Sequence, residues 1–133
     1  MSRSGYVDDC DYLPLYRQAV ERSLKGIRGQ AFLREMAEAL DAMPCKRLTT
    51  GELVDSLGDV CALGCVCQRR GINCDGVDSF NTKQVAKFVG ISEAMAAEIA
   101  DINDDDWLEM ETDWHRWTRV RKWVAEQIVV MAQ

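Results

Sequence analysis

Apolar residues recur at intervals of three and four along most of the chain, the spacing that places side chains on one face of an α-helix. One such stripe covers residues 13–27, and Pro14 suits the first turn of a helix there. A second stripe covers residues 30–43, and the proline that follows it predicts its end. Because Gly26 and Gly29 separate the two stripes, we expect an antiparallel pair of helices.

The segment near residues 47–54 breaks this period. It contains β-branched residues and a glycine, which favour one short β element. After it, Asp59 and Gly71 have the residue types that begin and end a short helix.

Helix signals continue to the end of the chain. Asn81 with Gln84 three residues later is typical of a helix start, and Gly90 with Ser92 marks a turn into the next helix. A last apolar stripe begins near Thr112. We therefore predict a mainly α fold, a single compact helical domain of about five helices covering residues 1–133.

Composition supports one domain. The chain has 133 residues, of which 47% are hydrophobic, enough for one buried core. It has no apolar run near the ~20 residues that cross a bilayer and no signal-peptide pattern at its start, so we expect a cytoplasmic protein that does not bind a membrane. In a reducing cytosol its six cysteines are expected to be free thiols.

The charge pattern changes the functional picture. The net charge of −6 disfavours binding to nucleic acid, whose phosphates require a basic face. Acids concentrate in "DINDDDWLEMETD", residues 101–113, which holds seven of them and no base. Tryptophans among charged residues are typical of protein-binding surfaces. The predicted partner-binding residues are Asp101, Asp104, Asp105, Asp106, Trp107, Glu109, Glu111, Asp113 and Trp114. Sequence leaves open whether the two tryptophans are exposed.

Four cysteines form the pattern C-x3-C-x-C-x6-C, at Cys61, Cys65, Cys67 and Cys74. Zinc sites usually present two close cysteine pairs on turns, which is a different spacing. On a helix, Cys67 lies about 160° around the axis from Cys65, so the two cannot share one ion. We therefore predict small core residues, with no metal and no cofactor. A zinc site and redox-sensing thiols are the alternatives.

The sequence of residues 84–99 has the helix, turn and helix pattern of a DNA-binding helix-turn-helix, but its second helix carries acids and no base. The alternative function is accordingly a nucleic-acid-associated regulator. It would use this corner or the basic residues of segment 116–122, with a zinc at the cysteines. His115 is the only histidine, and no nucleophile, phosphate loop or pair of catalytic carboxylates can be assigned, so we do not expect an enzyme.

Three segments, "IRGQAFLREMAEALDAMPCKRL", "VCALGCVCQRRG" and "RWTRVRKWVAEQI", carry a resemblance that spans nearly the whole chain. Together they resemble a family of small proteins of tailed phages and prophages that has no established activity. The resemblance implies a phage protein acting in the host cytoplasm. By analogy with other small acidic phage proteins, we expect a protein-binding module that inhibits a host defence system, as anti-CRISPR proteins do. Its partner would be a host protein or protein complex.

Overall fold

The computed structural model describes residue 3 and residues 13–105 and 111–129. The mainly α prediction is confirmed, since these residues form six helices. They are α1 (Leu13–Lys25), α2 (Ile27–Ala42), α3 (Ala62–Arg70), α4 (Thr82–Val89), α5 (Glu93–Asn103) and α6 (Asp113–Gln127). Within the described residues the predicted β element is reduced to one isolated antiparallel bridge between Val54 and Val60.

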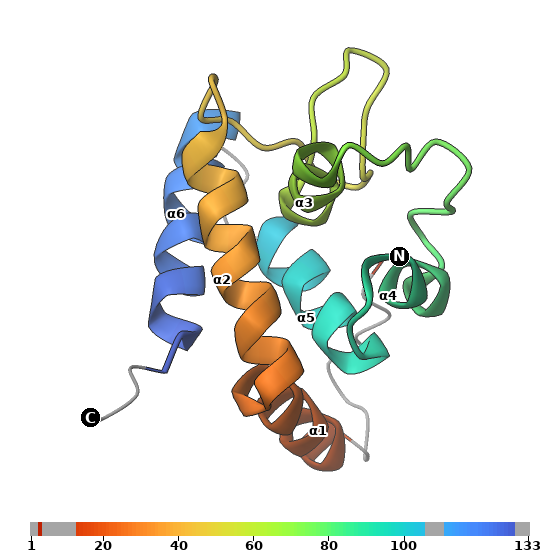
Figure 1. The fold of residues 1–133 in the computed structure, drawn as a ribbon, viewed down its shortest axis with the longest axis vertical. Helices are drawn as coiled ribbons and strands as arrows, with labels where there is room; N and C mark the ends of the chain where they lie inside the picture. The colour runs from red at the N-terminus through yellow and green to blue at the C-terminus, as the bar shows by residue number, and fades with distance from the viewer. Residues whose placement is uncertain (1–2, 4–12, 106–110, 130–133) are drawn as a thin grey trace.

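Helix α5 forms the centre of the fold and contacts α1, α3, α4 and α6 (Figure 1). Three of its residues are the buried alanines Ala96, Ala97 and Ala100, whose small side chains let neighbouring helices approach closely. Helix α2 packs mainly on α3 and α6, and the buried core takes side chains from all six described helices.

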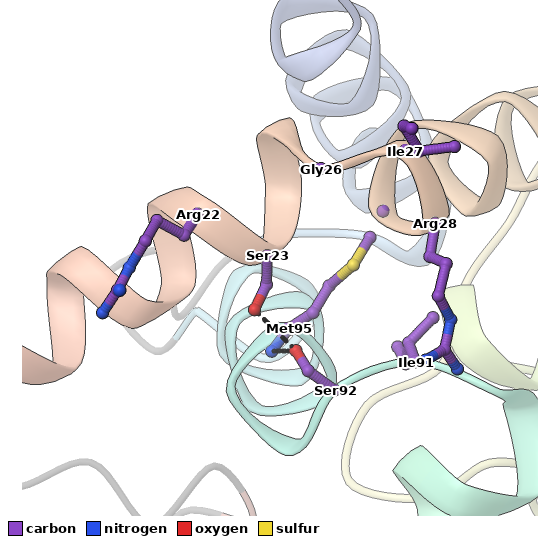
Figure 2. Close-up of a pocket in the computed structure, with 9 residues that line it drawn as sticks. Arg22, Ser23, Gly26, Ile27, Arg28, Ile91, Ser92 and Met95 are labelled. Carbon is purple, nitrogen blue, oxygen red and sulfur yellow. Dashed lines mark hydrogen bonds between the residues drawn. The ribbon is translucent and has the colours of Figure 1, made fainter.

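Helices α1 and α2 meet at a corner instead of forming the predicted antiparallel pair (Figure 2). That prediction was wrong because Gly26 alone separates the two helices, and an antiparallel helix hairpin needs a longer loop. The backbone before and after this corner approaches closely. A Cβ added to Gly29 would lie 1.8 Å from the carbonyl oxygen of Ser23, which explains why a glycine follows the corner.

The ends of the central helices agree well with the local signals. The side chains of Asn81 and Ser92 accept hydrogen bonds from the first turns of α4 and α5. Gly71 and Gly90 adopt the left-handed conformation and end α3 and α4. Helix α3 begins later than predicted, since its cap is Cys61, whose sulfur accepts from the N–H of Gly64 at 3.5 Å.

We expect Gly64→Ala to lower the free energy of unfolding by about 3 kcal/mol. A Cβ at Gly64 would lie 2.0 Å from the carbonyl oxygen of Leu53, so α3 and the loop before it would have to separate. Urea denaturation of the purified variant measures this loss. The matched control is Gly76→Ala, whose Cβ would meet open space and which we expect to stay within about 1 kcal/mol of the wild type. Equal losses in both variants would contradict the close packing.

Candidate functional site

The predicted acidic surface begins at the end of α5 and reaches the first turn of α6. Asp106, Trp107 and Glu109 lie outside the described residues. Asp101 and Asp105 are half-buried. The structure describes the contacts of the other four predicted residues. Asp104 and Glu111 are held in internal ion pairs, whereas Asp113 and Trp114 are exposed.

Asp104 is held in an internal ion pair with Arg3. The guanidinium donates from Nε to Oδ2 at 2.6 Å and from Nη2 to Oδ1 at 2.9 Å, and the Arg3 side chain is only 2% exposed. Oδ1 of Asp104 also accepts from the N–H of Gly51 at 3.1 Å. A carboxylate with this many internal donors is already neutralised inside the fold, so Asp104 contributes little charge to a partner.

Asn103, which is completely buried, continues this network into the core. Its Oδ1 accepts from the N–H of Ala62 at the start of α3 at 3.0 Å. Its Nδ2 donates to the carbonyl of Thr49 and to Asp104, each at 2.9 Å. Arg3 adds a contact from Nη1 to the sulfur of Cys61 at 3.5 Å. The side-chain amide is therefore satisfied on both sides, and it ties the end of α5 to the start of α3.

Glu111 is the second internal carboxylate, with a side chain only 4% exposed. Arg119 donates to it from Nε at 2.7 Å and from Nη2 at 3.0 Å, and Arg116 lies 3.4 Å away. The hydrogen bonds from Arg119 hold the pKa of Glu111 below its ordinary value. Asp113, which is more exposed, pairs with Arg116 at 2.6 Å. The acidic run thus presents less negative charge than the sequence indicates.

Trp114 is the exposed aromatic residue among the described members of the set. Thr112 caps α6 by accepting from the N–H of His115 at 3.1 Å, which places Trp114 in the first turn with 59% of its surface exposed. Its ring lies 5.3 Å from the His115 ring, tilted by 59°. Trp117, in contrast, packs against the core and donates from Nε1 to the carbonyl of Leu40 at 3.2 Å. Trp107 lies outside the described residues, so its exposure stays open.

Cys61, Cys65, Cys67 and Cys74 are all buried in the core, as predicted for small packing residues. Burial raises the pKa of Cys65 and of Cys67 to about 12. Such thiols are almost entirely protonated at neutral pH and react slowly. In the part of the chain that the structure describes, no three histidine, cysteine or acidic side chains are grouped to hold a metal ion.

The predicted helix-turn-helix corner forms at α4 and α5, but its second helix is not available to a DNA groove. Helix α5 is covered by four other helices, and most of its side chains are buried. Three basic residues of α6 already have partners, since Arg116 and Arg119 bind Glu111 and Arg121 binds Asp41 at 2.8 Å. Lys122 of the same helix is exposed. Most of the contacts expected for the nucleic-acid alternative therefore belong to the core or to ion pairs within the chain.

No protein-family model matches this chain, and no curated protein or solved structure shows significant similarity to it. Among the described helices, none is both long enough and apolar enough to cross a membrane.

We expect Arg3→Ala to lower the free energy of unfolding by about 3 kcal/mol, because it leaves the part-buried carboxylate of Asp104 and the core around Cys61 without their cation. Thermal and urea denaturation would measure the loss. Lys25→Ala is the matched control, since its pair with Glu21 is exposed on both sides and should contribute under about 0.5 kcal/mol. A loss for Arg3→Ala as small as that of the control would show that the ion pair is not structural.

Stability should depend on pH through Glu111 and Glu98 with opposite signs. The lowered pKa of Glu111 makes it stabilising above the ordinary glutamate range, and this stability is lost as the pH falls through the folded-state pKa. Burial raises the pKa of Glu98 in spite of Arg17, so Glu98 acts in the other direction. The rise in unfolding free energy from acid to neutral pH should become smaller in Glu111→Gln and larger in Glu98→Gln. Urea denaturation across this range tests the signs, and a change in the same direction for both variants would contradict them.

Proposed function

We propose that this protein is a non-enzymatic, phage-encoded binding protein that acts on a host protein or protein complex in the host cytoplasm. The target we propose is a host defence system, in the manner of anti-CRISPR proteins. The observation that supports the binding role is the exposure of Trp114 in the capped first turn of α6. Tryptophan is among the residues that most often supply the binding energy of protein interfaces.

The surroundings of Trp114 favour binding because they limit the entropy lost on association. Thr112 caps the helix, and the buried pair of Glu111 with Arg119 fixes the residue before the cap. The indole is thus presented by a turn that is ordered before a partner arrives. A suitable partner has an apolar pocket for the indole and a cation near the half-exposed carboxylate of Asp113.

Capture of host proteins by tagged protein from nuclease-treated bacterial lysate tests this proposal. We expect one host complex to be retained, and Trp114→Ala to weaken its binding by about 30-fold, the effect of losing an interface anchor. Phe80→Ala is the matched control, because Phe80 is an aromatic residue of similar exposure (62%) ahead of α4. Titration of the purified complex with each variant gives the two affinities.

Retention that disappears after nuclease treatment would instead favour the nucleic-acid-associated regulator. Equal weakening by Trp114→Ala and Phe80→Ala would remove the special role of Trp114. The proposed inhibition of a host defence system is tested separately, by the plating efficiency of a phage on a host with active immunity. We expect the wild type to raise this efficiency and Trp114→Ala to abolish the effect.

A further inference from the structure

A pocket of about 310 Å³ opens at the corner of α1 and α2, next to the start of α5 (Figure 2). Its apolar lining comes from Ile27, Ile91 and Met95. Arg22 and Arg28 flank it from opposite sides, and Arg28 donates to the carbonyl of Gly90 at 3.1 Å. The pocket therefore combines an apolar interior with a basic rim.

The two hydroxyl groups that line the pocket are already paired. The hydroxyls of Ser23 and Ser92 lie 2.8 Å apart, and Ser92 accepts from the N–H of Met95 at 3.1 Å. Ile27, however, is 92% exposed at the edge of the pocket. An occupant that fits this arrangement brings an aliphatic side chain for the interior and acidic groups for the rim.

The same chain carries such a group on the turn at residues 55–59. Leu57 is 85% exposed, yet the turn that carries it is fixed. Oδ1 of Asp55 accepts from the N–H groups of Leu57 and Asp59, each at 2.9 Å. Gly58 donates to the carbonyl of Asp55 at 3.0 Å and supplies the positive φ that the turn requires. The bridge between Val54 and Val60 closes its base.

The charges around Leu57 complement those around the pocket. Glu52, Asp55 and Asp59 lie within five residues of Leu57. Arg47 pairs with Asp59, and backbone N–H groups of the turn hold Asp55, so Glu52 is the exposed acid of the three. Arg22, Lys25 and Arg28 lie at the corner, where Glu21 pairs with the lysine. The turn and the corner are at opposite ends of the molecule (Figure 1), so Leu57 cannot reach the pocket of its own chain.

We propose that the pocket at the α1–α2 corner receives Leu57 of a second copy of this chain, which gives head-to-tail self-association. The two surfaces of such a contact differ, so the interface is heterologous and adds copies one after another unless a ring closes. The inference is independent of the host partner, because each half of the contact is on this chain. Added salt weakens the contact, since charged groups surround the buried leucine.

Sedimentation velocity over a range of protein concentrations tests the self-association. We expect the average mass of the wild type to rise with concentration, and Leu57→Ala to raise the dissociation constant about tenfold. Leu15→Ala is the matched control, because Leu15 is also exposed (64%) but does not line the pocket. A wild type that stays monomeric at every concentration, or equal effects of the two leucine variants, would overturn the proposal.

Mixing variants tests the geometry of the contact. The double variant Arg22→Glu/Arg28→Glu keeps its leucine turn but carries an acidic rim, whereas Leu57→Ala keeps an intact pocket. Each alone should be mainly monomeric, and an equimolar mixture should form one-to-one dimers that grow no further, because only one working interface remains. Circular dichroism and unfolding curves confirm that both variants fold. No dimer in a mixture of folded variants would overturn the head-to-tail arrangement.

Discussion

The fold depends on the polar network at the end of α5, where a fully buried amide and an ion pair join parts of the chain that are far apart in sequence. Asn103 binds the start of α3 and the carbonyl of Thr49, and Asp104 binds Arg3 and Gly51. Buried polar groups are costly unless each finds a partner, so this network permits one arrangement of its surroundings. The apolar core favours a compact state, and the network specifies which helix ends meet within it.

The same network controls the candidate surface. Arg119 donates to the carbonyls of Ile102 and Asn103 at 2.7 and 3.4 Å while it holds Glu111. The start of α6 is thereby attached to the end of α5, and carboxylates that look solvated in the sequence become internal partners of arginines. Among the described residues of this surface, their neutralisation leaves Trp114 as the exposed aromatic side chain. Affinity at this surface would then depend more on desolvation than on long-range attraction.

Sequence predicted the parts of the structure whose signals are local. The caps at Asn81 and Ser92 and the glycine ends at Gly71 and Gly90 depend on residues within one or two turns, and the structure contains all four. Other features depend on distant contacts. Arg3 and Asp104 are 101 positions apart, and the need for a glycine at position 64 arises from the carbonyl of Leu53. Neither follows from periodicity or propensity. The arginines of α6 are visible in the sequence, but Arg121 pairs with Asp41 of α2, 80 positions away, and that pairing depends on how α2 and α6 meet.

The polar network at the end of α5 supports both exposed residues, Leu57 and Trp114. Asn103 holds Thr49, whose N–H donates to the carbonyl of Val60. Together with the N–H groups of Leu57 and Asp59 that donate to Asp55, these contacts fix the turn that carries Leu57. On the other side, Arg119 fixes Glu111 and the turn that carries Trp114. A change inside this network would therefore loosen two surfaces at once, and it would weaken both proposed contacts through the same entropy cost. Substitutions of Trp114 or Leu57 remove only the side chain that we propose to touch a partner, so they can separate the proposed host-binding role from the proposed self-association.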